Sequence, residues 1–269
     1  MNWWQGKRVL ITGASDGIGR SICWELDQKG VGELVLVARD HSRLLETAEN
    51  CSATTRIEQV DLTDIDQVMD LVKRLRKTPI DVLINNAGSG IGGEFQTQDE
   101  QALLSMMRLN CDSVVLLSRS LLPAMLEKRD GAILFVGSLA GWAGGPGLCV
   151  YSATKGFVNR FAEGLRWELK GSGVRIGLLA PGVTRTSFFR SAGIDEEDLR
   201  AGSLSPQQVA QAAVSGIEND RAITVPGLWN RILLVAQGWA PRSLVGWMSR
   251  RIFSRVLHSQ VPAQQKKED

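Results

Sequence analysis

The sequence has little of what metal, disulfide and nucleic-acid sites require. Only two of its 269 residues are histidines, and its four cysteines, Cys23, Cys51, Cys111 and Cys149, are far apart with no CxxC pair. The sequence therefore predicts no metal site and free thiols, which suits a reducing cytosol. The formal net charge is only +2, and basic residues are interleaved with acids. This pattern excludes a basic surface for nucleic acid.

Long apolar runs are also missing. None approaches the roughly 18 residues of a membrane-spanning helix, so no such helix is expected. The charge of Lys7 comes too early for a secretory signal, which favours a cytoplasmic location. With 43% hydrophobic residues, the chain can bury a full core. We expect one large domain over residues 1–269.

The chain has a single tyrosine, Tyr151, and Lys155 follows it four residues later. Residues four apart lie on the same face of a helix, so the ammonium group is expected near the phenol. A fixed cation lowers the pKa of a phenol toward the range where general acid–base catalysis is efficient. The pair predicts an acid–base site if the chain also has a matching cofactor site.

A strand, a glycine-rich turn and a helix follow one another near the N-terminus. The apolar run at residues 7–12 ends at Gly13, and Gly17 and Gly19 come next, before a helical pattern. Glycines let the backbone approach a pyrophosphate, and a helix N-terminus offers free N–H groups. The order predicts a dinucleotide site, although the spacing is GxxxGxG rather than GxGxxG.

The second predicted strand, residues 33–38, ends beside Arg39. At this point of a dinucleotide-binding fold an acid binds the ribose 2′-hydroxyl of NAD, whereas an arginine accommodates the 2′-phosphate of NADP. Arg39 therefore favours NADP(H). NAD(H) stays possible, because Asp16 and Asp40 are close by in the sequence.

Strand and helix patterns alternate over roughly 180 residues, which predicts an α/β fold with one doubly wound, Rossmann-like parallel sheet. Asp61 follows the third strand and could contact an adenine or cap the next helix. Ser138 follows the fifth strand, at the sheet edge where ligands bind. Further strands are expected at 56–60, 81–85, 131–137, 174–179 and 222–225, and helices at 64–76, 99–129 and 151–170.

In order and spacing, these residues resemble the classical short-chain dehydrogenase/reductase family. The resemblance implies an NAD(P)-dependent oxidoreductase, and it covers nearly the whole domain. The motifs that carry it are Thr12-Gly13-xxx-Gly17-x-Gly19, Asp61, Asn85-Asn86-Ala87-Gly88, Asn110, Ser138, Tyr151-xxx-Lys155 and Pro181-Gly182-xxx-Thr186.

The resemblance also implies roles. Tyr151 is the general acid in carbonyl reduction, Lys155 holds the nicotinamide ribose and lowers the pKa of Tyr151, and Ser138 positions the substrate oxygen. Asn110 holds a water that links Lys155 to solvent. The implied cofactor contacts are Gly13, Ser15, Gly17, Ile18 and Gly19 at the pyrophosphate, Arg39 at the 2′-phosphate, Asp61 and Leu62 at the adenine, Asn86, Ala87 and Gly88 at the riboses, and Thr186, after Pro181 and Gly182, at the carboxamide.

The sequence departs from the family pattern twice. Gly137 stands where many members have a second serine before Ser138, and we expect this change to be tolerated. Asp16 stands in the glycine-rich turn, where many NADP-preferring members have a basic residue. NADP specificity is then expected to rest on Arg39 alone.

Residues 186–206 are expected to form a lid over the substrate. Phe188 and Phe189, with Leu139, Trp142 and Leu148, could line an apolar pocket. The expected reaction is therefore reduction by NADPH of a moderately apolar ketone or aldehyde. One alternative is NAD-dependent alcohol oxidation at the same site. Another is a non-enzymatic dinucleotide sensor or scaffold, which fits poorly because such proteins tend to lose the catalytic tyrosine or lysine and this chain keeps both.

The C-terminal segment 226–258 is rich in tryptophan and arginine and is expected to be helical. Such a helix suits packing on its own domain or on another subunit, and it also suits peripheral contact with a membrane. Residues 262–269 are predicted to be disordered. The family resemblance implies a homodimer or homotetramer, assembled through the two long helices at 99–129 and 151–170.

Overall fold

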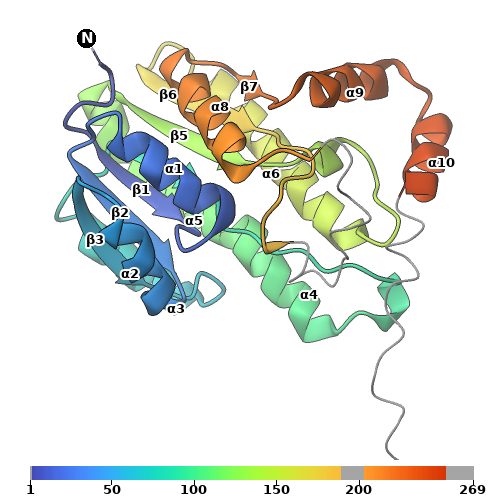
Figure 1. The fold of residues 1–269 in the computed structure, drawn as a ribbon, viewed down its shortest axis with the longest axis horizontal. Helices are drawn as coiled ribbons and strands as arrows, with labels where there is room; N and C mark the ends of the chain where they lie inside the picture. The colour runs from blue at the N-terminus through green and yellow to red at the C-terminus, as the bar shows by residue number, and fades with distance from the viewer. Residues whose placement is uncertain (1, 189–202, 253–269) are drawn as a thin grey trace, which may run out of the picture.

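The computed structural model describes residues 2–188 and 203–252, and their strands form one seven-stranded parallel sheet (Figure 1). The strand order is β3-β2-β1-β4-β5-β6-β7, and every neighbouring pair is parallel. The predicted doubly wound sheet is confirmed. The strands are β1 (Arg8–Thr12), β2 (Glu33–Ala38), β3 (Thr54–Gln59), β4 (Val82–Asn85), β5 (Gly131–Val136), β6 (Val174–Leu179) and β7 (Ile223–Thr224).

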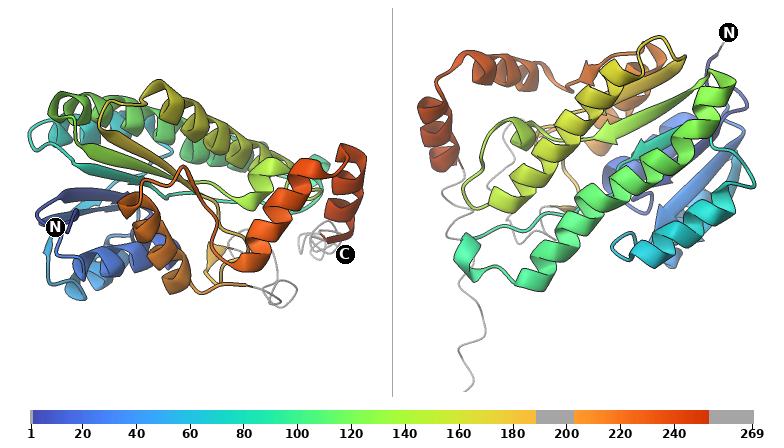
Figure 2. Two further views of the ribbon diagram at one scale, coloured as in Figure 1. Left: turned by 90° about the horizontal axis from the view of Figure 1, so that it is seen from above. Right: turned by 180° about the vertical axis from the view of Figure 1, so that it is seen from behind.

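Helices cover both faces of the sheet (Figure 2). Alternate residues of β2 show why its whole run is apolar: Leu34 and Leu36 pack into one core layer, and Val35 and Val37 pack into the other. A strand buried on both faces has no polar alternation. The first layer is covered by α1 (Gly17–Asp27), α2 (His41–Glu49) and α8 (Pro206–Glu218), and the second by α3 (Ile65–Leu75), α5 (Ser113–Lys128) and α6 (Cys149–Glu168).

The predicted helix at 99–129 is present but is interrupted around Asn110. Asp99 caps α4 (Glu100–Met107), a π-helical turn runs over Arg108–Asp112, and α5 ends at Arg129 with a left-handed φ of 53°. A π turn inserts one residue into the helix and often marks a functional site. Short 3-10 helices lie at η1 (Phe95–Thr97) and η3 (Leu139–Trp142).

One helical span in the described part of the chain, Glu100–Lys128, is long and apolar enough to cross a membrane by length and composition, although none was expected. Its best window has a mean hydropathy of 1.2 and is 39% buried. Leu117, Leu121 and Met125 of this span pack into the core beneath the sheet. Core packing therefore accounts for part of its apolar composition.

After β7 the chain leaves the sheet in two helices, α9 (Leu228–Trp239) and α10 (Arg242–Ile252). Both lie beyond the end of the sheet, with α10 turned sharply against α9 (Figure 1). Pro241 separates them, because proline has no N–H for a helix interior. The predicted helical segment 226–258 is thus two helices as far as 252. Residues 253–258, the predicted tail at 262–269 and most of the predicted lid lie outside the described residues.

Candidate active site

A cavity of about 740 Å³ lies at the carboxyl edge of the sheet. β1 and β4 are neighbours in the sheet, and the strand order runs outward from them in both directions. This is the switch point where open α/β sheets bind ligands. The volume falls in the usual range for small-molecule and cofactor sites.

The glycine-rich turn forms one wall of the cavity. Gly13 and Gly17 have φ values of 66° and 53°, which side chains other than glycine rarely adopt. A β-carbon at Gly19 would lie 2.2 Å from the carbonyl oxygen of Gly13, so α1 packs directly on the turn. The first N–H groups of α1 therefore lie at the cavity, where an anion would find donors and the positive end of the helix dipole.

Asn86 joins this turn to the loop after β4. Its Nδ2 donates to the carbonyl oxygen of Thr12 at 2.8 Å, and Thr12 Oγ1 accepts from the N–H groups of Asn86 and Ala87. Asn85 Nδ2 donates to Ser118 Oγ at 3.0 Å. Asn86 thus ties the backbone of the glycine-rich turn to the loop after β4, and Asn85 ties the end of β4 to α5.

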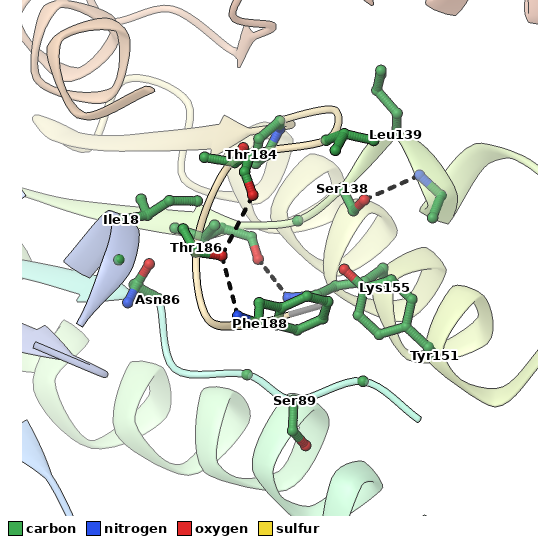
Figure 3. Close-up of a pocket in the computed structure, with 18 of the residues that line it drawn as sticks. Ile18, Asn86, Ser89, Ser138, Leu139, Tyr151, Lys155, Thr184, Thr186 and Phe188 are labelled. Atoms are coloured by element: carbon green, nitrogen blue, oxygen red, sulfur yellow. Dashed lines mark hydrogen bonds between the residues drawn. The ribbon is translucent and has the colours of Figure 1, made fainter. Parts of the chain in front are cut away.

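Ser138, Tyr151 and Lys155 meet deeper in the cavity (Figure 3). Ser138 follows β5, and the other two lie one turn apart near the start of α6. Tyr151 hydrogen-bonds to the hydroxyl of Ser138. Lys155 Nζ donates to the carbonyl oxygen of Val136 at 2.9 Å and lies 6.0 Å from the Tyr151 ring centroid. The sheet edge and one helix face thus bring the predicted hydroxyls and amine together.

The pKa values of this group differ from the sequence expectation. Burial raises the pKa of Tyr151 to about 12, and its hydrogen bond with Ser138 only partly offsets this. Burial lowers the pKa of Lys155 to about 8, against a smaller opposing effect of Cys111. Lys155 is not among the groups that act on the pKa of Tyr151 here, and its ammonium group donates to the carbonyl oxygen of Val136, so burial sets the direction of the shift. At neutral pH the phenol is protonated.

Asn110 is buried behind the cavity wall. Its Nδ2 donates to the carbonyl oxygen of Ser89 at 2.9 Å and to Thr154 Oγ1 at 3.0 Å, and its Oδ1 accepts from the N–H of Ser89. A β-carbon at Gly88 would lie 3.2 Å from both Asn110 Oδ1 and Lys155 Nζ. The asparagine in the π turn therefore fixes the loop that passes over the lysine.

The outer end of the cavity carries two arginines. Arg39 lines it as predicted, and Arg43 from the first turn of α2 joins it. Arg43 forms a 2.8 Å ion pair with Asp16, the N-cap of α1. Burial acts to raise the pKa of Asp16, but hydrogen bonds from Ser187 and Gly17 and the charge of Arg43 lower it overall. Asp16 is therefore a paired anion, and Arg43 is a second basic residue beside Arg39 at this end of the cavity.

Asp61 lines the cavity and does not cap the following helix. Its Oδ1 accepts from Thr63 N and Oγ1 within its own turn, at 2.9 and 2.8 Å. The N-cap of α3 is Asp64, which accepts from the N–H groups of Asp66 and Gln67. The capping alternative is therefore excluded, and the contact with an adenine stays a prediction.

The inner end of the cavity is apolar. The Phe188 ring packs on Tyr151 with centroids 5.4 Å apart, and Leu139 and Leu148 line the same space. Trp142, predicted to join them, instead packs against the second core layer, and Phe189 lies outside the described residues. Helices α9 and α10 complete this end, which the sequence did not reveal, with Asn230, Leu233, Ala236, Gln237, Ala240, Val245, Met248 and Ser249.

Most of the predicted site residues line this one cavity. Gly19 and Asn110 stand behind its wall, where they pack the glycine-rich turn and the loop at Gly88. The residues that line it as predicted are Gly13, Ser15, Gly17, Ile18, Arg39, Asp61, Leu62, Asn86, Ala87, Gly88, Ser138, Tyr151, Lys155, Pro181, Gly182 and Thr186.

Comparison with known proteins gives the family. The family model for short chain dehydrogenase matches residues 7–197. The protein is a short-chain dehydrogenase. It is 36% identical over 220 residues to a ketoacyl reductase, HetN, of a Nostoc species, covering 80% of this chain and 76% of that one. As a family member with relatives named oxidoreductases, it is an oxidoreductase enzyme.

Solved structures of short-chain dehydrogenases share the fold. One from Sphingobium yanoikuyae in complex with NADPH is 32% identical, with a TM-score of 0.77 over 86% of this chain and 94% of that one. A bulky-bulky ketone specific alcohol dehydrogenase from Comamonas testosteroni is 30% identical, with a TM-score of 0.72 over 86% and 92%. A nicotinamide dinucleotide is thus the cofactor class of this short-chain dehydrogenase.

The cavity of this short-chain dehydrogenase fits a nicotinamide dinucleotide. Gly13 and Gly17 form a cradle whose backbone conformation excludes other side chains, and the α1 N–H groups face it. Arg39 and Arg43 stand at one end and Lys155 at the other, separated by the loop after β4. Positive groups therefore flank a backbone cradle for phosphate, as a dinucleotide requires.

Asn159 is a residue of this short-chain dehydrogenase that the sequence did not single out. It lies on α6, and its Nδ2 donates to the carbonyl oxygen of Ser138 at 3.1 Å. A β-carbon at Gly137 would lie 2.0 Å from its Oδ1. Asn159 thus explains the departure at Gly137, since its side chain fills the space that a serine would need.

Proposed function

We propose that the protein is an NADPH-dependent reductase of moderately apolar ketones or aldehydes. The observation that carries the proposal is the Tyr151 phenol, hydrogen-bonded to Ser138, at the junction of the glycine cradle and the apolar end of one cavity. A carbonyl oxygen held there would face two hydroxyl donors, and its carbon would face the cofactor side at Thr186.

Ser138 and Tyr151 act on the carbonyl oxygen of the substrate. When bound, the dinucleotide supplies a hydride, which forms the new C–H bond as the carbonyl π electrons move to oxygen. Tyr151 gives its O–H proton to that oxygen, so one hydride and one proton convert the carbonyl to an alcohol. Ser138 hydrogen-bonds the same oxygen and stabilises its developing charge. The raised pKa of Tyr151, about 12, keeps the phenol protonated at neutral pH, which is the form that reduction needs.

Lys155 and Asn110 support this proton transfer. Lys155 would hold the nicotinamide ribose hydroxyls and return a proton to Tyr151 after each turnover. Its pKa of about 8 suits an amine that must both hold and release a proton near neutral pH. Asn110, which fixes the loop beside Lys155, would keep a water in the path from this amine to solvent.

The preference for NADPH rests on Arg39 and Arg43 at the end of the cavity where β2 and α2 meet. A 2′-phosphate there would find two guanidinium groups, which bind phosphate bidentately. Two acids also lie at this end of the cavity: Asp16 is paired with Arg43, and Asp40 caps α2 by accepting from the Arg43 N–H, so each repels a phosphate less than a free carboxylate would. The NADPH complex of the Sphingobium relative supports the same choice.

The preference for an apolar carbonyl rests on Leu139, Leu148 and Phe188 around Tyr151. Leu233 and Met248 extend this apolar wall from the C-terminal helices. The Comamonas relative is named for bulky ketones and the Nostoc relative for ketoacyl reduction, and both names support a carbonyl substrate.

Assembly and location belong to the same proposal. Leu104, Met107, Phe157 and Trp167 are large apolar side chains of α4 and α6 that stand exposed, which suits a homodimer or homotetramer joined through α4, α5 and α6. The four cysteines carry free thiols, which suits the reducing cytoplasm. Light scattering after size exclusion measures the assembly directly.

The experiment is the oxidation of NADPH and of NADH by the purified protein against ketones and aldehydes that span acyl thioesters, steroids, sugars and quinones. The proposal expects turnover with NADPH on an apolar class. Turnover with NADH at equal or greater kcat/KM would contradict the cofactor preference. Turnover confined to sugars would contradict the apolar substrate.

A further inference from the structure

Helix α9 is apolar on the side that faces away from the protein. None of its twelve residues is buried. Leu228, Ile232, Val235 and Trp239 recur at the spacing of one helix face, and all are exposed, Trp239 by 88%. Trp229, at the edge of this face, is 75% exposed.

Two polar side chains of α9, those of Asn230 and Gln237, face the other way. Asn230 and Gln237 line the cavity, and Asn230 Nδ2 donates to the carbonyl oxygen of Pro226 at 2.7 Å. A β-carbon at Gly182 would lie 2.5 Å from Asn230 Oδ1, so this face packs on the protein. An ordinary surface helix has the reverse arrangement, with its apolar face inward. An outward apolar face indicates an external apolar surface as its partner.

Helix α10 continues this surface. Leu244, Trp247 and Met248 are exposed, and the guanidinium of Arg251 stacks over the Trp247 ring at 5.6 Å. Arg250 is also exposed. Tryptophan beside arginine is typical of helices that lie in the headgroup region of a bilayer.

The charge of the segment that contains α9 and α10 indicates which kind of surface it binds. No Asp or Glu lies between Asp220 and Glu268, whereas eight Lys or Arg do. All 29 acidic residues of the chain lie outside this stretch. The C-terminal element is therefore purely cationic on a body in which acids outnumber bases, and a cationic amphipathic surface binds anionic lipid.

We propose that α9 and α10 dock the protein on an anionic phospholipid surface, with Trp229, Trp239 and Trp247 in the headgroup region and Arg250 and Arg251 at the lipid phosphates. A second copy of the chain is the weaker candidate. Two such elements facing each other would bring together surfaces of the same charge with no acid to pair them.

The docking surface reaches the rim of the cavity. Leu233 and Met248 line the cavity and are also 46% and 43% exposed. A protein docked in this way has its cavity rim at the lipid, where apolar carbonyl compounds partition. This consequence rests on the proposed function, whereas the docking itself does not.

The test is co-sedimentation of the full-length protein with vesicles of phosphatidylcholine alone and of phosphatidylcholine with about 30 mol% phosphatidylglycerol. We expect binding to the anionic vesicles that weakens with salt, and little binding to the neutral ones. W229S/W239S should lose it, and R250Q/R251Q should weaken it by about tenfold or more. L45S is the control, because Leu45 is 42% exposed on α2, away from this surface, and it should bind as the wild type does.

Two results would overturn the proposal. One is failure of the wild type to bind anionic vesicles while W229S/W239S lowers the mass measured by light scattering, which would assign the surface to a second copy. The other is failure to bind with no change in mass. All variants alter exposed residues, and circular dichroism verifies that they fold. Because sedimentation needs no turnover, its outcome is separate from that of the NADPH assay.

Discussion

The side chain of Asn159 occupies the space beside Gly137: a β-carbon at position 137 would lie 2.0 Å from Asn159 Oδ1. The same asparagine donates from Nδ2 to the carbonyl oxygen of Ser138 at 3.1 Å. Asn159 of α6 thus packs against the residue that follows β5 and holds the backbone of Ser138, the serine that faces Tyr151.

The first prediction follows from this packing. G137S should lower the free energy of unfolding by about 1–3 kcal/mol, because an added side chain in a filled space forces strain. In G137S/N159A the loss should be smaller than the sum of the two single losses, because the closest clash, with Asn159 Oδ1, is gone and only that with Leu178 Cδ1 at 2.9 Å remains. Urea denaturation measures the free energy of unfolding of G137S, N159A and the double variant. G144S is the control, since a β-carbon at Gly144 meets no atom within 4 Å. Additive losses in the double variant would contradict the packing explanation.

The second prediction concerns the stability cost of Lys155. Its folded pKa, about 8, lies below the ordinary 10.5. Below pH 8 it is charged in both states, and its burial costs stability. Between about 8 and 10.5 only the unfolded state is charged, so wild-type stability rises there, by an amount on the order of 3 kcal/mol. K155M should therefore equal or exceed the wild type at pH 7 and lose that advantage by pH 10.5. Urea denaturation of the wild type and of K155M without dinucleotide, at pH 7 and at pH 10.5, measures the difference in unfolding free energy. A pH-independent difference would contradict it.

The third prediction concerns the direction of reaction. Reduction needs a protonated Tyr151 and a protonated Lys155, so its kcat/KM should be level near neutral pH and fall as the pH passes about 8. Alcohol oxidation is the reverse step and needs the Tyr151 phenolate beside a protonated Lys155, so its kcat/KM should rise with pH up to about 8 and level off above it. Paired pH profiles with one ketone and its alcohol test this. Parallel profiles would show that neither group controls the rate.

The fourth prediction separates the charges at the outer end of the cavity. R39A should raise the KM for NADPH by about tenfold and leave that for NADH nearly unchanged, because only NADPH has a 2′-phosphate. D16N should lower the KM for NADPH a few-fold, since asparagine also caps a helix and Arg43 would lose its paired anion. R119A, an exposed arginine on α5, is the control. Equal effects on both dinucleotides would contradict the assignment.

The sequence predicted the fold and the acid–base group because both depend on local order. Alternating strands and helices specify the sheet, and residues four apart, such as Tyr151 and Lys155, share a helix face wherever the helix lies. The individual cofactor residues were implied by the family resemblance, and most of them line one cavity because parallel strands end at one edge of the sheet.

Contacts between segments that are distant in the sequence could not be predicted from local sequence order. Asn159 meets Gly137 across the junction of α6 and β5, and Arg43 reaches Asp16 from another helix. The pKa of Tyr151 depends on burial, which no local pattern reports. The tryptophans and arginines of segment 226–258 were visible in the sequence, but only the fold shows that the apolar face of α9 points outward.

The most direct measurement is NADPH oxidation with a bulky apolar ketone by the wild type and by Y151F. Phenylalanine keeps the ring that packs on Phe188 and removes only the proton donor, so we expect kcat to fall by about 10²–10⁴ with thermal stability and NADPH affinity close to the wild type. A Y151F enzyme that reduces the ketone at the wild-type rate would contradict the assignment of Tyr151 as the general acid.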